Sequence, residues 1–537
     1  MPTSADDYHV LVAGAGPVGL TAAHELARRG LRVRLVDALP GPATTSRAIA
    51  THPRTLEIYD QMGLVAPILE RGQRIHAFTI FKEGTRLARL AADYSTMPTR
   101  FPFSFIIEQT ETEAVLRNEL SRQGVKVEWG TRLAGLRQDG DAVRAELVHQ
   151  DGTVEQARVP WLVGCDGGHS VVRKVLQLPL IGESSETWMI ADAQVDTDLP
   201  RDSIYWVHSG GEALMLAPMR EQGRWRMLDT IDVERDVPAA EAAARFSRKF
   251  SRGLGRRTTV SEPSWTSVFT FQQRMVPSMR VGRCFVAGDA AHVHSPASGQ
   301  GMNTGIQEAY NLAWKLALVH HGHASQELLD TYSAERVPVG ERLLKSTRTA
   351  TFLVQLRNSL AGLMLPVVFG VVRNVPAVRV RMQRKILGGV SGLRLEYPGS
   401  PLTVPAPHGR GPRPGQRLTE AAAGRGAGGE ALADELRELR WTLLVWGLSP
   451  QETELATRLD ERHRAWLSVR TLTGRPDAGG PNPLHDPDGQ VRDGLGERGW
   501  ILARPDGYVC ARGEPLSESR LRPAFAVIGQ AVIGQDP

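Results

Sequence analysis

An α/β fold with more than one domain is what the 537-residue sequence predicts. Short apolar runs end at glycine-rich turns and are followed by apolar residues at helical spacing, which is typical of buried parallel strands alternating with helices. Alternating apolar and polar residues between Asp192 and Trp265 predict a further sheet inserted into this pattern. A glycine- and proline-rich stretch, residues 398–429, separates both from a last α/β segment.

The composition, with 41% apolar and 23% charged residues, is that of an ordinary globular protein. The net charge of +5 is small for this length, and the chain has no basic block with interleaved aromatic residues, so nucleic-acid binding is not indicated. Cys165, Cys284 and Cys510 lie far apart and form no CxxC. Neither a disulfide framework nor a zinc site is therefore expected, and a reducing cytoplasm fits.

Two segments bear on location. Residues 1–16 carry no basic region before their apolar run, so no signal peptide is expected. The apolar run Ser359–Val372 is interrupted by Pro366 and is shorter than the ~20 residues that span a membrane. We expect a buried or partner-packed helix there, with a membrane-surface or lid segment as the alternative, and no stable membrane insertion.

The first element is a short apolar strand, Val10–Ala13, that leads into a GxGxxG turn and a helical stripe from Leu20 to Ala27. Gly30 suits the end of this helix, and a second strand, Val33–Val36, stops at Asp37. This is the βαβ fingerprint of dinucleotide binding, in which the glycines admit a pyrophosphate and the acid reaches the ribose hydroxyls. The fingerprint does not separate FAD from NAD, and a glycine turn that binds nothing is the alternative.

Arg47 and Arg54 flank a segment that becomes helical. Two arginines suit an anionic ligand, but a solvated helix face explains them equally well. His52, between them, is expected at the surface. Beyond this segment, the pattern predicts a strand before Gln109, a helix and three antiparallel strands, at Phe101–Ile107, Glu111–Leu120, Val125–Trp129, Ala142–Val148 and Thr153–Val159.

A buried strand at Trp161–Cys165 ends at Asp166 and two glycines. The same order of strand, acid and glycines recurs at Cys284–Ala287, Gly288 and Asp289, followed by a loop and a helix that we expect to begin with Asn303 or Thr304 as N-cap. Backbone N–H groups at a helix start stabilise anionic oxygen, whereas a carboxylate suits a hydroxylated chain. The stretch therefore predicts a ligand with both features, such as a flavin with its ribityl tail.

Past Leu316 the pattern stays helical to about Leu387, and the glycine- and proline-rich stretch follows. Strands are then expected at Trp441–Trp446 and Trp466–Val469, with a hairpin at Ile501–Ala511 that turns at Pro505-Asp506-Gly507.

Three motifs now stand in order: GAGPVG with Asp37, CDGGHS around Asp166, and GRCFVAGDAAHVHSPASGQGMN around Asp289. Together they resemble the single-component FAD-dependent aromatic hydroxylases, the group of para-hydroxybenzoate and phenol hydroxylases. The HPRTLE and GPRPGQR segments are most similar to the branch that contains polyketide hydroxylases.

The resemblance implies a Rossmann-type FAD-binding domain with a helical extension, built from residues 1–180 and 280–395. It further implies an inserted mixed β-sheet substrate domain at 181–279, a linker at 396–430 and a thioredoxin-like α/β domain at 431–537. The redox CxxC of thioredoxin is missing, so Cys510 is expected to have a structural or dimer-contact role, which leaves a homodimer open.

The resemblance also implies residue roles. The pyrophosphate of FAD would lie at the fingerprint glycines, the adenosine ribose at Asp37, and the phosphate and ribityl parts at Arg47 and Gln109. Asp166 belongs to a motif associated with both FAD and NAD(P)H, and Asp289 would hold the ribityl or pyrophosphate region. The residues in the glycine and isoalloxazine sets are Gly14, Gly16 and Gly19, and Pro296, Gly299, Gly301, Met302 and Asn303.

The implied activity is a monooxygenase in which NADPH or NADH reduces FAD, dioxygen forms a flavin C4a-hydroperoxide, and one oxygen atom is transferred to an aromatic ring. Baeyer–Villiger insertion, epoxidation and antibiotic-inactivating hydroxylation are alternatives within the same cofactor chemistry. A flavin reductase or dehydrogenase, and a noncatalytic flavin-binding assembly partner, are alternatives outside it.

The strand Ala213–Met219 (ALMLAPM) offers no serine or arginine for a substrate carboxylate. Met215 and Pro296 are therefore expected to contact a bulky, largely apolar phenol or quinone, although a plain core strand would show the same pattern. No side chain is assigned as a catalytic base. The HxH of His292 and His294 has no third ligand at suitable spacing, so no metal is expected.

Overall fold

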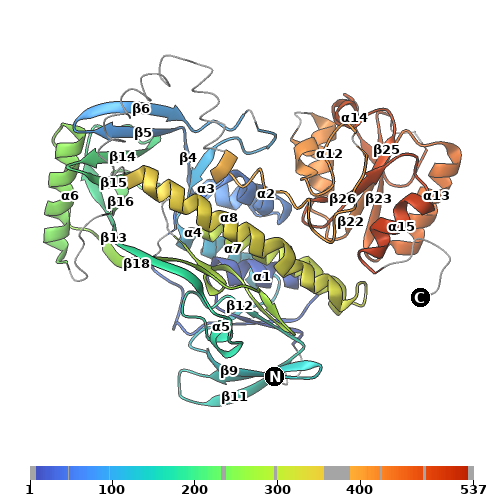
Figure 1. Cartoon of the computed structure of the whole chain (residues 1–537), viewed down its shortest axis with the longest axis horizontal. Helices are drawn as coiled ribbons and strands as arrows, with labels where there is room; N and C mark the ends of the chain where they lie inside the picture. Colours follow the sequence, from blue (N-terminus) through green and yellow to red (C-terminus); the bar gives the residue numbers. More distant parts are fainter. Residues whose placement is uncertain are drawn as a thin grey trace.

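The structure is a computed structural model, and it describes residues 8–45, 48–95, 97–230, 237–294, 299–355, 388–407, 409–423, 426–475 and 479–529. Two long helices, α7 (Gly301–His320) and α8 (Asp330–Gln355), lie in the middle of the molecule. Figure 1 shows a large sheet at one end and a separate α/β unit, in orange and red, at the other. The apolar run Ser359–Val372 and the candidate residues Arg47 and Pro296 lie outside the described residues.

The first sheet has the expected Rossmann arrangement. Its strand order is β19-β20-β12-β1-β2-β8, and all neighbours are parallel except the β19–β20 pair. Helix α1 (Pro17–Ala27) connects β1 to β2 and packs against α7 and α4. The strands are β1 (Val10–Ala13), β2 (Val33–Val36), β8 (Val127–Glu128), β12 (Trp161–Gly164), β19 (Arg280–Val281) and β20 (Cys284–Val286).

One predicted strand belongs to a different sheet than expected. The stretch Val125–Trp129 contains β8, which is the parallel edge strand of the Rossmann sheet. The antiparallel three-stranded sheet instead begins with β9 (Arg132–Asp139) and continues with β10 (Ala142–Val148) and β11 (Val154–Val159). Half-buried strands on both sides of the Gly130 turn have the same alternation, so periodicity alone did not reveal which sheet each one joins.

The second large sheet is mixed, as expected, and nine-stranded in the described part of the chain, with the order β21-β18-β13-β16-β15-β14-β5-β6 and β17 beside β13. β14 and β5 pair in parallel, and β14 and β15 form a hairpin through Gly210-Gly211, both with positive φ. The strands are β5 (Ala77–Lys82), β6 (Thr85–Ala91), β13 (Ile181–Asp196), β14 (Ser203–Ser209), β15 (Glu212–Pro218), β16 (Arg224–Asp229), β17 (Thr259–Val260), β18 (Trp265–Met275) and β21 (His292–Val293).

Two features of this sheet differ from the expectation for residues 181–279. β5 and β6 come from far upstream, so an inserted unit would have to include residues 77–91. A 16-residue helix, α6 (Ala239–Leu254), covers the outer face where only strands were expected. Its alanine-rich start and the buried pair Phe246 and Phe250 show a helical period that alternating strands on either side obscured.

Smaller elements fill the space between the two large sheets. α4 (Gln109–Arg122) begins at Gln109, two residues before the expected start. α7 begins at Gly301 with Gln300 as its N-cap, so the expected N-cap at Asn303 or Thr304 is wrong. The remaining elements here are α2 (Pro53–Gln61), α3 (Val65–Arg71), α5 (Val171–Val175), the 3-10 helices η2 (Gly288–Ala290) and η4 (Gln326–Leu329), and the three-stranded sheet β3-β7-β4, built from Ala50–Thr51, Ser104–Ile106 and Gln73–Ile75.

The C-terminal unit has a five-stranded sheet with the order β24-β23-β22-β25-β26. Its hairpin joins β25 (Gly499–Ala503) to β26 (Val509–Gly513), close to the expected bounds, and Cys510 is buried in β26. The other strands and helices are β22 (Trp441–Trp446), β23 (Leu467–Thr473), β24 (Pro483–His485), α11 (Thr419–Ala422), α12 (Ala427–Glu435), α13 (Pro450–His463), α14 (Gln490–Leu495) and α15 (Glu518–Ala526).

The expected linker packs closely where the structure describes it. Tyr397, Arg417 and Leu418 expose 5% or less of their surface, and α11 and the start of α12 fall within the stretch. The division into domains stays a prediction. Among the described residues, no helix is long and apolar enough to cross a membrane.

Candidate active site

A cavity of about 890 Å³ lies between the carboxyl ends of the Rossmann strands and the mixed sheet. One end is lined by the fingerprint turn and the loop before α7, and the other by side chains from β14, β15, β16 and β18. Ligands of open α/β sheets bind at the carboxyl ends of the strands, so this position is the one that the fold favours. The candidate residues that line the cavity are Gly16, Gln109, Met215, Asp289, Gly299, Gly301 and Met302.

Each of the three fingerprint glycines is required, or left open, for a different structural reason. Gly14 has a φ of +103°, and a Cβ there would lie 2.3 Å from the carbonyl oxygen of Cys165. A Cβ on Gly19 would lie 1.8 Å from the carbonyl oxygen of Gly14. A Cβ on Gly16 would meet nothing within 4 Å. The first and third glycines are therefore required by the turn itself, whereas the space at Gly16 is open to a ligand.

The start of α1 is ready for an anion. Gly16 is its N-cap, and among the described residues no side-chain cap binds the first backbone N–H groups. The first turn also contains no acidic residue. Unsatisfied amides and the positive end of the helix dipole together favour a phosphate at this point.

Asp37 and Asp166 both bind backbone amides. One carboxylate oxygen of Asp37 accepts a hydrogen bond from Ala15 N at 2.6 Å, and the other accepts from Leu39 N at 2.8 Å. Asp166 Oδ2 accepts from Val171 N at 2.7 Å at the start of α5. The buried Oδ1 of Asp166 has no hydrogen-bond partner among the described residues. Neither acid lines the cavity, although both close turns that border it.

The glycine-rich stretch after β20 supplies the opposite wall. Asp289 is exposed and faces the cavity, while Gly288 before it is buried and has a φ of +61°. Gly301 and Met302 open α7, whose N-cap Gln300 makes no capping hydrogen bond to the helix and donates instead to Gly389 O. Asn303 lies behind this wall, where its amide donates to Ala50 O and Gly299 O and its oxygen accepts from His52 N. Asn303 thus fixes the loop against the 50–52 segment.

A buried ion pair holds the turn from behind. Glu308 on α7 accepts hydrogen bonds from Gly288 N at 2.9 Å and from His292 Nε2 at 2.8 Å. Burial alone would lower the pKa of His292, but the Glu308 carboxylate raises it above its ordinary value. Within the described residues, no group of three or more His, Cys, Asp or Glu side chains could hold a metal ion.

The mixed sheet gives the cavity an apolar wall. Met215 lies in this wall with other side chains that are aromatic or aliphatic, namely Phe78, Ile80, Ile190, Ile204, Trp206, Leu228, Trp265 and Phe269. Arg226 is the charged residue of the same wall. Its Nε and Nη2 donate hydrogen bonds to the Asp192 carboxylate at 2.7 and 2.6 Å. The guanidinium also lies 5.4 Å from the centre of the Trp265 ring. A paired arginine therefore faces the cavity, a feature that the strand Ala213–Met219 alone did not reveal.

Two expectations for the 47–54 segment are wrong. His52 is 7% exposed and lines the cavity instead of lying at the surface. Arg54 is 1% exposed and does not line the cavity. It pairs with Glu57 and donates to Asp506 O. The sequence signal for His52 is its place directly before Pro53, at the start of a helix that is buried throughout.

The chain matches the family model described as "FAD binding domain" over residues 7–347. This match spans both glycine-rich turns that line the cavity. The chain belongs to the FAD-dependent aromatic hydroxylase family. The open space at Gly16, the two uncapped helix starts and the exposed Asp289 fit FAD, which needs donors for its phosphates and an acceptor for its hydroxyls.

Relatives share nearly the whole chain. The 6-methylpretetramide 4-monooxygenase of Streptomyces rimosus is 49% identical over 519 residues, covering 96% of this chain and 92% of that protein. The pentachlorophenol 4-monooxygenase of Sphingobium chlorophenolicum is 32% identical and covers 95% of each. The solved structure of the anhydrotetracycline hydroxylase OxyS from Streptomyces rimosus is 28% identical, with a TM-score of 0.72 over 96% of this chain and 98% of that one.

This family member is an FAD-dependent aromatic monooxygenase. The fold is also that of the flavin-dependent monooxygenase PieE, solved with FAD and substrate, at 23% identity with a TM-score of 0.78 over 97% of this chain and 99% of that one. The expectation of a polyketide hydroxylase-like branch is confirmed by the names of these relatives.

Proposed function

We propose that this monooxygenase hydroxylates a polycyclic aromatic substrate of the polyketide type, using NADPH or NADH and dioxygen. The observation that carries the proposal is the cavity, which joins the glycine-rich loop before α7 to an apolar wall with aromatic side chains. Its volume of about 890 Å³ is near the upper end of small-molecule sites, so it has room for a multi-ring substrate beside part of the cofactor.

For the cofactor, we assign the pyrophosphate of FAD to Gly16 and the start of α1. Gly14 and Gly19 would shape the turn that brings these groups to the pyrophosphate. Asp37 would accept from the adenosine ribose, for which each of its oxygens keeps a second lone pair beside its backbone bond. The remaining assignments are Arg47 and Gln109 for the phosphate and ribityl parts, Asp166 for the motif shared by FAD and NAD(P)H, Asp289 for the ribityl chain, and Pro296, Gly299, Gly301, Met302 and Asn303 for the isoalloxazine.

For the substrate, we assign Met215 and Pro296 to the ring-binding surface. The apolar wall would exclude water and hold flat rings by stacking on Trp206 and Trp265. The Arg226–Asp192 pair carries no net charge, so it would bind a phenol or carbonyl oxygen more readily than a free carboxylate. Bound FAD would supply the electron transfer and the oxygen activation, and the protein would supply position and a dry site.

The test is NADPH and NADH oxidation by the FAD-loaded protein with a panel of polycyclic phenols, with product mass measured under heavy-isotope dioxygen. We expect substrate-stimulated oxidation and a product that gains one labelled oxygen atom. Simple hydroxybenzoates are the control, and fast oxidation coupled to their hydroxylation would contradict the substrate assignment. Product formation without dioxygen would indicate a dehydrogenase instead, and FAD binding with no NAD(P)H oxidation would indicate a noncatalytic role.

A further inference from the structure

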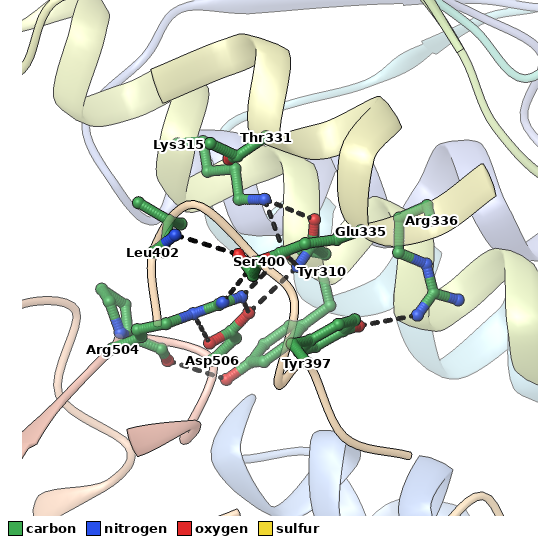
Figure 2. A network of polar contacts seen from close by, with 12 residues as sticks. Tyr310, Lys315, Thr331, Glu335, Arg336, Tyr397, Ser400, Leu402, Arg504 and Asp506 are labelled. Carbon is green, nitrogen blue, oxygen red and sulfur yellow. Dashed lines mark hydrogen bonds and ion pairs between the residues drawn. The ribbon is translucent and has the colours of Figure 1, made fainter. Parts of the chain in front are cut away.

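A cluster of buried charges joins the C-terminal unit to the two central helices (Figure 2). Arg504 and Asp506 come from the turn between β25 and β26, and Lys315 and Glu335 come from α7 and α8. All four side chains are 2% exposed or less. None of the four lines the cavity.

Glu335 is the centre of the cluster. Its carboxylate accepts from Arg504 Nη1 at 2.5 Å and Nη2 at 3.0 Å, and from Lys315 Nζ at 2.8 Å. Ser400, from the stretch before the C-terminal unit, donates to the same carboxylate at 2.6 Å. Arg504 also binds Asp506 Oδ1 through Nε at 2.9 Å. The two cations and two anions balance, with Lys315 from α7, Glu335 from α8, and both Arg504 and Asp506 from the turn.

From this cluster a second set of contacts leads to the Gly288–Asp289 turn in the cavity wall. The Tyr397 ring lies 5.2 Å from the Arg504 guanidinium, and its hydroxyl accepts from Arg336 Nη1 at 2.9 Å. Arg336, next to Glu335 on α8, also donates to Thr304 O in the first turn of α7 and lies 3.8 Å from Glu308. Glu308 in turn holds the Gly288 amide and His292 on either side of Asp289.

The energetics make this path stiff. A charge that is buried without its partner costs several kcal/mol, roughly 3–5 when one member of a pair is removed. Moving the 504–508 turn away from α8 would remove both Arg504 hydrogen bonds from the buried Glu335 carboxylate, which would keep its bond to Lys315. The turn and the helices therefore hold one arrangement, and α7 carries that arrangement to its own N-terminus at the cavity.

We propose that the C-terminal unit fixes the Gly288–Asp289 turn through this path, which makes Arg504 a positioning residue for FAD. The inference rests on the proposed placement of FAD at that turn. This role of the C-terminal unit requires no redox-active cysteine pair. It therefore agrees with Cys510 being buried and without a neighbouring cysteine in the sequence. Coupling between two sites is reciprocal, so bound FAD must also stabilise the 504–508 turn.

The first test is amide hydrogen exchange on the full-length wild-type protein with and without FAD. We expect FAD to slow exchange in residues 499–513 by at least about fivefold, the low end of ordinary coupling free energies. Protection limited to residues near the cavity, such as 284–305, with unchanged exchange at 499–513, would overturn the inference. Absence of FAD binding to the wild type would instead overturn the proposed function.

The second test compares Arg504→Met, Arg504→Lys and a matched control, Arg470→Met. Arg470 pairs with the buried Glu435 at 2.6 Å within the C-terminal unit, away from α7 and α8. We expect the Kd of FAD, measured by flavin fluorescence, to rise at least about fivefold in Arg504→Met, to change less in Arg504→Lys, and to stay within about twofold in the control. The visible absorption bands of bound FAD should also shift in Arg504→Met alone.

Equal Kd values and equal flavin spectra in Arg504→Met and Arg470→Met would contradict the inference. If Arg504→Met does not fold, the hydrogen-exchange comparison on the wild type decides, because it needs no variant.

Discussion

Two turns of this molecule look alike in sequence and differ completely in structure. Asp289 and Asp506 each follow a buried strand and a turn residue, and each lies beside a glycine. Asp289 is exposed in the cavity wall, whereas Asp506 is 2% exposed and held by Arg504 and Asn311. Only the first turn leaves a carboxylate accessible to a ligand.

The difference lies in what surrounds each turn. The Gly288–Asp289 turn borders the cavity beside a loop of glycines and two helix starts without side-chain caps, and its Asp289 is exposed there. The 504–508 turn packs against α7 and α8, and its acid Asp506 binds Arg504 of the same turn and Asn311 of α7. An acid at the end of a strand is thus a binding group in one case and a structural group in the other.

Removal of the buried acid should have the largest effect. In Asp506→Ala, Arg504 loses one of its two carboxylate partners in a dry interior, and we expect the free energy of unfolding to fall by about 3–5 kcal/mol. Urea unfolding followed by circular dichroism measures it. Asp289→Ala is the control, because an exposed substitution changes stability by only about 0.5 kcal/mol. Similar losses in both variants would break the comparison.

The exposed acid should instead matter for the ligand. In Asp289→Ala, FAD loses a charge-assisted hydrogen bond worth about 1.5–3 kcal/mol, which corresponds to a rise in Kd of roughly 10- to 100-fold. Flavin fluorescence titration of the apoprotein checks this value. Asp289→Asn, which keeps one acceptor oxygen, should lose less affinity than Asp289→Ala. An unchanged Kd in both variants would remove Asp289 from the proposed site.

Gly14 and Gly16 of the fingerprint turn allow a second comparison between a structural and a ligand-binding position. Gly14→Ala must strain a φ of +103° and push against Cys165, so we expect a stability loss of about 1–3 kcal/mol. Gly16→Ala meets no protein atom and should cost less than about 1 kcal/mol, but its methyl group should block FAD. Thermal unfolding of the two apoproteins, and FAD titration of Gly16→Ala, separate the effects. Full FAD affinity in Gly16→Ala would contradict the pyrophosphate assignment.

The smallest expected effect is on pH dependence. Burial lowers the pKa of Lys315 to about 8, although Glu335 beside it acts in the opposite direction. Because the unfolded value of 10.5 is higher, the unfolded chain holds more protons between pH 8 and 10.5, and the contribution of Lys315 to stability rises with pH in that window. We expect about 1 kcal/mol of this rise between pH 8 and 9.

Urea unfolding at these two pH values should show the rise in the wild type and in the control Lys174→Met, which changes an exposed side chain. Lys315→Met should lack it. An identical pH dependence in all three proteins would show that the buried cluster does not hold Lys315 in the way that its burial implies.

The sequence by itself determined the parts of the protein that depend on local geometry. Sequence patterns identified the GxGxxG turn, the strand Val10–Ala13 and the glycine-rich loop after Cys284. Glycines at positive φ or close backbone approaches, and apolar periodicity, can be recognised from consecutive residues. The family, the cofactor and the apolar strand that carries Met215 followed from the same kind of local signal.

Only the tertiary structure decided which distant groups meet. It placed Arg54 against Asp506, paired Arg226 with Asp192 in the cavity wall, brought His52 to the cavity and joined β8 to the Rossmann sheet. A charged side chain looks the same in sequence whether water or a partner hundreds of residues away neutralises it. Packing of the 504–508 turn against α7 and α8, distant in sequence, therefore separated the buried Asp506 from the accessible Asp289.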